Sequence, residues 1–202
     1  ERWWSYEECL LKHAGEYAKF DEHEVLDLWE SLFKTVVQDS SISDVALGAF
    51  LSGGIDSSLT TAFLQEITSQ PVKTFSIGFS QSDYDESRYA QQVASFLGTE
   101  HSCLMVSERE VSEILPEMST SYDEPFADSS QILSSLLSRH ARQGVTVALS
   151  GDGGDEMFGG YNRYKWASVI SKVAATTPRT MLKVGSSVCL LIEKTLRKLH
   201  NS

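Results

Sequence analysis

The sequence predicts an α/β fold in which a mostly parallel sheet carries helices on both of its faces. Short apolar runs alternate with amphipathic segments of helical length through the middle of the chain, and two of these runs lead directly into glycine-rich loops. Strands separated by helices of this length typically pair in parallel. Ligands of such sheets bind beyond the carboxyl ends of the strands. Both glycine loops follow predicted strands, so we expect them to face the same ligand.

The first part of the chain begins with an aromatic and acidic lead-in, residues 1–44, that ends in a helix. Apolar residues recur in it at helical spacing from Val25 to Val37 and form one stripe. The apolar run at 45–51 predicts the first strand, which meets the first glycine loop. A helix follows this loop, because apolar residues share one of its faces as far as Ile67.

The next pattern repeats this order of elements. A second strand is predicted at 72–79, and a polar loop at 80–87 leads from it into a helix that Gly98 ends. A third strand is expected at 102–106.

Capping and breaking residues mark the elements that come after it. Ser107 and Glu110 form the S-x-x-E capping box of another helix, whose regularity we expect Pro116 to interrupt. A helix at 130–143 then precedes a fourth strand at 145–150. This strand leads into the second glycine loop, and the last forty residues are expected to be helical. We therefore expect three parts in one domain: the lead-in at 1–44, a core at 45–164 and a basic helical tail at 165–202.

Composition excludes several classes of function. The 202 residues carry a net charge of −11, which argues against a nucleic-acid partner because phosphate binding relies on clustered Lys and Arg. No stretch approaches the roughly 18 to 20 apolar residues of a membrane span, and residues 1–20 lack the basic and then apolar layout of a secretory signal. The three cysteines have no C-x-x-C spacing, so neither a disulfide framework nor a zinc site is predicted. We expect a cytoplasmic protein without a membrane partner.

The basic tail is the exception to this acidic balance. From Tyr161 onward the chain has eight Lys or Arg and one Glu, which gives +7 and leaves −18 for the first 160 residues. We interpret the tail as a solvated helix face, with an acidic or phosphorylated partner as the alternative.

The first glycine loop, LSGGIDSS at 51–58, matches neither common phosphate-binding pattern, since it lacks G-x-G-x-x-G and the lysine of a Walker loop. Its glycines would let backbone N–H groups approach an anion, and three serine hydroxyls and the helix dipole add further donors. Asp56 would repel phosphate oxygens unless a divalent cation bridged the two. Mg²⁺ is the cation that commonly does so.

At this point the motifs resemble a known family. SGGIDSS at 52–58 resembles the pyrophosphate loop of the N-type ATP pyrophosphatases, or PP-loop enzymes, whose fold is like that of the adenine nucleotide alpha hydrolases. With SDVALGAFLSGG at 43–54, DEPFADSS at 123–130 and LSGDGGDEMFGGY at 149–161, the resemblance narrows to the synthetase domain of glutamine-hydrolysing asparagine synthetases. It implies cleavage of ATP to AMP and pyrophosphate, with aspartate or another small carboxylate activated as an acyl-adenylate. Ammonia from glutamine would then form the amide.

The resemblance also implies site residues for ATP and Mg²⁺. The residues implied to bind ATP are Leu51, Ser52, Gly53, Gly54, Asp56, Ser57, Ser58, Ile77, Ser150 and Gly151. Asp56 and Asp155 would bind Mg²⁺, and Asp56 and Asp152 would be the catalytic acids. Asp152 occupies an acidic position that some members fill with the longer Glu.

The residues also have simpler interpretations. Asp56 is a suitable helix N-cap, and Asp152, Asp155 and Glu156 are common in solvated turns. We expect structural roles for His101 and His140.

The resemblance further implies segments that these residues do not match. A glutaminase domain and a downstream segment with a catalytic lysine are expected to be missing, so the chain should bind Mg-ATP but complete amide synthesis poorly. The alternatives are a related or β-lactam-synthetase-like enzyme that adenylates another carboxylate, and a non-catalytic nucleotide-binding domain. A homodimer is kept as an option.

Overall fold

The computed structural model describes residues 3–13, 15, 19–79, 85–124, 128 and 130–176. The chain divides into two compact units, Glu1–Asp152 and Gly153–Ser202, so the division falls inside the second glycine loop. The elements of the first unit are α1 (Tyr6–His13), α2 (Glu22–Ser40), β1 (Leu47–Phe50), α3 (Ile55–Ile67), β2 (Lys73–Phe79), α4 (Ser87–Leu97), β3 (Glu100–Val106), α5 (Glu108–Ser121), α6 (Ser130–Ala141) and β4 (Val147–Leu149). Those of the second unit are α7 (Gly154–Phe158) and α8 (Asn162–Thr176).

The four strands form one parallel sheet in the order β3-β2-β1-β4. Phe50 of β1 is in register with Phe75 of β2, and Ala49 of β1 is in register with Leu149 of β4. Because neighbouring strands run in the same direction, the carboxyl ends of β1 and β4 lie side by side at one edge. The parallel sheet predicted from the sequence is confirmed.

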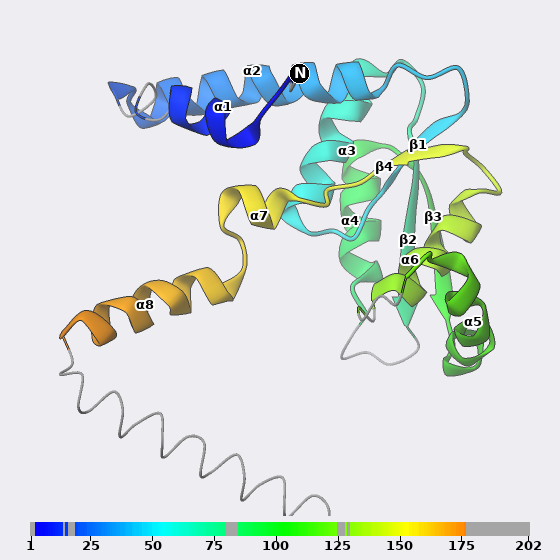
Figure 1. Cartoon of the computed structure of the whole chain (residues 1–202). Coiled ribbons are helices and arrows are strands. Elements are labelled where there is room, and N and C mark those ends of the chain that lie inside the picture. Colours follow the sequence, from blue (N-terminus) through cyan, green and yellow to red (C-terminus); the bar gives the residue numbers. More distant parts are fainter. Residues whose placement is uncertain are drawn as a thin grey trace, which may run out of the picture. The chain divides into compact units, whose positions relative to one another are not determined.

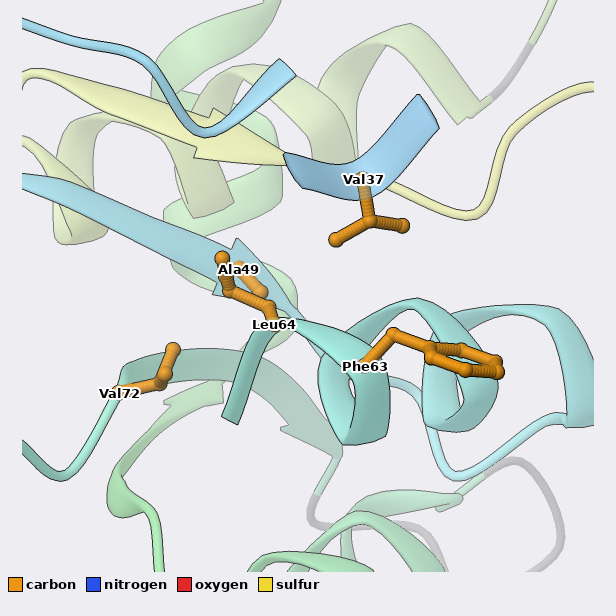
Figure 2. Packing of buried hydrophobic residues seen from close by; sticks show 5 residues of the cluster. All are labelled: Val37, Ala49, Phe63, Leu64 and Val72. Carbon is orange, nitrogen blue, oxygen red and sulfur yellow. The ribbon is translucent and has the colours of Figure 1, made fainter. Parts of the chain in front are cut away.

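Helices cover both faces of the sheet, as alternate residues along β1 show. Ala49 packs with Val37, Phe63, Leu64 and Val72 in a buried cluster formed with α2 and α3 (Figure 2).

The opposite face has a second cluster. It joins Phe75 to Ala141 and Val145, and Phe50 packs against it from β1. Figure 1 shows α3 and α4 on one side of the sheet and α6 on the other, which confirms the predicted arrangement.

The capping box predicted from Ser107 and Glu110 is present at the start of α5. The expected interruption at Pro116 was wrong, because α5 continues through it to Ser121. Pro116 is exposed, so its ring and missing N–H disturb only the surface of one helix. The predicted helical stop at Gly98 is also confirmed, since this residue ends α4 with a φ of 72°.

Two sequence patterns differ from the structure. The apolar stripe of the lead-in lies on α2, but Val37 is the buried residue of this helix, and Leu28 and Leu32 are 45% and 60% exposed. The second glycine loop contains a short helix, α7, that its glycine content concealed.

Parts of some predicted features lie outside the described residues. These are 80–84 of the polar loop, 125–127 and 129 of the DEPFADSS motif, Cys189, and the tail from 177 to 202. The expected helix of the tail is confirmed as far as Thr176. Among the described helices, none is long and apolar enough to cross a membrane.

Candidate functional site

The loop between β1 and α3 extends the sheet by one residue before it turns. Leu51 is buried, and its N–H donates to the carbonyl oxygen of Phe75 at 2.9 Å. The side chain of Leu51 packs with Ala90 and Ala94 of α4. The loop therefore leaves the sheet at Ser52, beside the first turns of α4.

Gly53 is required by both its conformation and its surroundings. Its φ is +82°, a region that residues with a Cβ rarely adopt. A Cβ at this position would also lie 2.6 Å from the backbone nitrogen of Ala90. The glycine thus allows the loop to press against the backbone of α4.

Two serines hold the loop in shape. The hydroxyl oxygens of Ser52 and Ser57 are 2.9 Å apart, and the Ser57 hydroxyl also accepts the N–H of Ser52 at 3.2 Å. The N–H of Gly54, the N-cap of α3, donates to the Ser52 hydroxyl at 3.2 Å. These bonds stay within the loop, so the two serines shape the site as well as offering hydroxyl groups to a ligand.

The first turn of α3 presents backbone donors. The N–H groups at the start of an α-helix have no acceptor within the helix, and the helix dipole makes this end partially positive. Here they belong to Ile55, Asp56 and Ser57. The Ser58 hydroxyl is buried beside them and has no hydrogen-bond partner within the described part of the chain. The start of α3 is thus suited to bind the oxygens of an anion.

Two buried threonines, which no sequence motif indicated, stabilise this first turn by hydrogen bonds to its carbonyl oxygens. Thr60 donates its hydroxyl to the carbonyl oxygen of Asp56 at 2.9 Å, and Thr61 donates to that of Ser57 at 2.8 Å. Thr61 is fully buried. Their position one turn after the loop was visible in the sequence, but no pattern there distinguishes them from ordinary helical residues.

Asp56 is the second residue of α3 and is partly buried. A carboxylate at this position interacts favourably with the helix dipole. Gly54, and not Asp56, is the N-cap residue, so the simple capping interpretation of Asp56 is wrong. Among the described residues, no Lys or Arg forms an ion pair with Asp56. Its carboxylate is therefore available to a cation.

The loop after β4 meets the first loop. A Cβ at Gly151 would lie 2.6 Å from the backbone nitrogen of Ser57 and 3.0 Å from Cβ of Asp56. Ser150 accepts the N–H of Asp152 at 3.2 Å, and Asp152 itself is exposed. The two predicted loops thus come together at the N-terminus of α3.

The side chain of Ile77 lies on the opposite face of the sheet from that of Leu51. It is partly buried near the end of β2, and it shares the face of Phe75 by alternation along the strand. Leu51 instead packs toward α4. The structure therefore brings together most of the predicted residues but does not place the side chain of Ile77 among them.

Asp155 belongs to the second unit, where it is the second residue of α7. Its carbonyl oxygen accepts the N–H of Gly160 at 3.1 Å, and a Cβ at Gly160 would collide with its carboxylate oxygen. Tyr161 donates its hydroxyl to Glu156 at 2.7 Å, which lowers the pKa of Glu156. Among the described residues, no three His, Cys, Asp or Glu side chains group around one position suited to a metal.

Comparison with known protein sequences identifies one family. The family model described as Asparagine synthase matches residues 28–201. A protein of Methanocaldococcus jannaschii, provisionally named asparagine synthetase (glutamine-hydrolyzing) 2, is 38% identical over 187 residues, which cover 90% of this chain and 35% of that protein. Asparagine synthetase (glutamine-hydrolyzing) 1 of Bacillus subtilis is 43% identical over 123 residues, which cover 61% of this chain and 19% of that protein.

Among solved structures, the chain is similar to an NH3-dependent NAD synthetase from Campylobacter jejuni. The TM-score is 0.44 and the sequence identity 17%, over 71% of this chain and 62% of that chain. The chain spans 35% of the length of the Methanocaldococcus relative, so it corresponds to one part of that protein. Because the family model covers most of the chain, this protein belongs to the asparagine synthase family.

Proposed function

We propose that this chain is the ATP-binding synthetase domain of an asparagine synthetase. It would activate the side-chain carboxylate of aspartate as an acyl-adenylate, with pyrophosphate as the leaving group, for amide formation with ammonia from glutamine. The observation that carries this proposal is the loop at 51–58. Its hydrogen-bond donors lie at the start of α3, and Gly151 lies close to them. Membership in the asparagine synthase family supports it.

The residues present fit a magnesium nucleotide. In the first unit, the start of α3 offers N–H groups to phosphate oxygens, and Asp56 offers a carboxylate of the kind that Mg²⁺ prefers. Asp155 of the second unit is a proposed metal ligand on the family resemblance alone. Mg²⁺ usually takes only one or two protein carboxylates and completes its shell with water and phosphate, so a cluster of three acids is not required. When bound, it would neutralise charge on the phosphates and on the departing pyrophosphate.

The chain's own residues would act by position and charge. In the proposed reaction, the substrate carboxylate attacks the α-phosphorus of ATP, pyrophosphate leaves, and ammonia later displaces AMP. The N–H groups of α3 and the hydroxyls of the loop would hold the pyrophosphate in line with this attack. No protein nucleophile is needed, and Asp152 is the proposed second acid.

The same proposal includes three properties of the whole protein: ammonia supplied by a glutaminase domain, a homodimer and a cytoplasmic location. For this chain it includes the division into a lead-in at 1–44, a core at 45–164 and a basic tail at 165–202.

Calorimetry with ATP and Mg²⁺ tests the binding step. Asp56→Asn should weaken Mg-ATP binding at least about tenfold, because the carboxylate that faces the cation is lost. Asp155→Asn should weaken it as well. Asp27→Asn makes the same charge change at an exposed position on α2 and should leave binding unaltered. If Asp56→Asn binds Mg-ATP as tightly as Asp27→Asn does, the proposed role of Asp56 is wrong.

Pyrophosphate release by the complete natural protein tests the reaction. The substrates are a panel of small carboxylates, each with glutamine or with ammonia. Release that depends strictly on aspartate supports the proposal. Release with a sugar acid or a β-amino acid would identify a related carboxylate-adenylating enzyme, and no release with any of them would indicate a nucleotide-binding domain without catalysis.

A further inference from the structure

Asp85 lies outside the predicted site, yet it joins two elements that shape the site. One of its carboxylate oxygens accepts the N–H of Phe79, the last residue of β2, at 3.3 Å. The same oxygen accepts the N–H of Ser87, the first residue of α4, at 3.1 Å. A single side chain thus ties the end of a central strand to the start of a helix.

Among the residues that the structure describes, Asp85 is the one whose side chain caps the start of α4. Its N-cap residue, Glu86, has a φ of −89° and a ψ of −2° and forms no capping bond with its side chain. An uncapped helix start leaves N–H groups without acceptors, which favours fraying of the first turn. Asp85 therefore supplies the cap from one position earlier. Hydrogen bonds from the hydroxyl and the N–H of Ser87 lower the pKa of Asp85, so this cap is ionised at neutral pH.

The turn that Asp85 caps is the surface on which the first glycine loop rests. A Cβ at Gly53 would lie 2.6 Å from the backbone nitrogen of Ala90 and 2.6 Å from Cβ of Tyr89. Ala90 is fully buried against Leu51. Close contact between backbones transmits displacement, because neither side has a flexible side chain to absorb it.

We propose that Asp85 is a positioning residue for the candidate ATP site: by capping α4 and tying it to β2, it fixes the wall that sets the shape of the loop at 51–58. This inference rests on the proposed function for its link to ATP. Its structural part, the control of the loop by Asp85, is measurable without any ligand.

The first test is hydrogen–deuterium exchange of the loop in the absence of ATP. Asp85→Ala should speed exchange in residues 51–58 about tenfold, because the first turn of α4 loosens. Asp85→Asn keeps an oxygen acceptor and should restore slow exchange. The matched control is Asp21→Ala, which removes the capping box of α2 and should leave exchange in the loop unaltered. Loop exchange in Asp85→Ala equal to that of the wild type overturns the inference, and so does a failure of Asp85→Asn to restore it.

The second test is the KM for ATP in pyrophosphate release by the complete natural protein. Asp85→Ala should raise this KM about tenfold and leave the KM for the carboxylate substrate unchanged. A residue that only stabilises the fold would lower the amount of active protein and therefore kcat, without moving the KM for ATP. An unaltered KM in Asp85→Ala contradicts the positioning role. Absence of turnover in the wild type would refute the proposed function instead, and hydrogen exchange would still decide the role of Asp85.

Discussion

The loop at 51–58 and the segment at 153–161 both combine glycine with aspartate, yet different contacts hold them in shape. Gly53 lies close against the backbone of Ala90, which belongs to α4, a helix that packs on the sheet. In the second segment, the N–H groups of Gly159 and Gly160 bond to the carbonyl of Asp155, within the same short turn. Among residues 153–176, none that the structure describes in burial is fully buried.

The two segments thus differ in what determines their shape: contacts with other elements in the first, and local hydrogen bonds in the second. Contacts with buried elements determine the shape of the first loop before any ligand arrives, so a ligand loses less free energy in ordering it. Exposed local hydrogen bonds open more readily, since water replaces them at little cost. We therefore expect substitutions in the first loop to change both stability and binding. Substitutions in the second segment should change stability only slightly, and Asp155 is the residue there for which we propose an effect on Mg-ATP binding.

The largest effect is expected for Gly53→Ala. A positive φ costs an alanine about 1 kcal/mol or more, and the collision with Ala90 adds about 2 kcal/mol, so the free energy of unfolding should fall by about 3 kcal/mol. Gly98→Ala is the control, because Gly98 has a φ of +72° but nothing within 4 Å of its Cβ position. Urea denaturation of both variants separates the two costs. Equal losses in the two variants would mean that Ala90 does not restrain the loop.

Gly151→Ala tests the contact between the two loops. Its Cβ would lie 2.6 Å from the nitrogen of Ser57 and would cover an N–H group of α3. We expect Mg-ATP affinity to fall about tenfold or more in calorimetry, with a loss of stability of about 2 kcal/mol. Gly153→Ala, whose Cβ meets nothing within 4 Å, should carry only the cost of its positive φ. Unaltered affinity in Gly151→Ala would show that Ser57 N–H does not face the nucleotide.

His101 makes the stability of the first unit sensitive to acid. Its ring nitrogens lie 2.9 Å from the Thr74 hydroxyl and 3.1 Å from the Ser76 hydroxyl, and burial lowers its pKa from 6.5. The unfolded chain then binds the proton more readily than the folded one. The contribution of neutral His101 to stability is thus full above pH 6.5 and declines as the pH falls toward the lowered pKa.

The measurement is the free energy of unfolding as a function of pH. His101→Gln should be less stable than the wild type at neutral pH but should lose less stability between neutral pH and about pH 5. His23→Gln, at an exposed position on α2, should follow the wild type. Identical slopes for His101→Gln and the wild type would contradict this account.

The sequence was sufficient to predict elements that local patterns encode. The parallel sheet follows from the alternation of strands and helices, and the cap of α5 follows from Ser107 and Glu110, three residues apart. The two glycine loops could be placed at strand ends for the same reason.

Contacts between distant segments could not be predicted in this way. The approach of Ala90 to Gly53 and of Gly151 to Ser57 depends on how helices pack against the sheet, and no single stretch of sequence contains that distance. The stripe on α2 illustrates the same limit, because the pattern identifies an apolar face but not which part of it is buried. The roles of Thr60, Thr61 and Asp85 likewise became visible only from their hydrogen bonds.

The smallest effect is expected for Tyr161→Phe in the second segment. The hydrogen bond from Tyr161 is the main cause that lowers the pKa of Glu156, so its removal should raise this pKa toward the ordinary value of 4.5. The ionised Glu156 contributes stability above pH 4.5, and this contribution is lost as the pH falls through the lowered pKa. Glu156 is exposed and Tyr161 is only partly buried, so we expect almost no change in global stability at neutral pH.

Carbon-13 NMR titration of the carboxyl groups measures this shift directly. Asp85 serves as the internal control, because its pKa is lowered by Ser87 in the first unit and should stay constant in Tyr161→Phe. An unchanged pKa of Glu156 would mean that Arg163 and the backbone hold the carboxylate without Tyr161. A shift confined to Glu156 supports the view that local hydrogen bonds hold the segment at 153–161. A simultaneous shift in the pKa of Asp85 would show that the two regions titrate together, and it would contradict the difference drawn between this segment and the first unit.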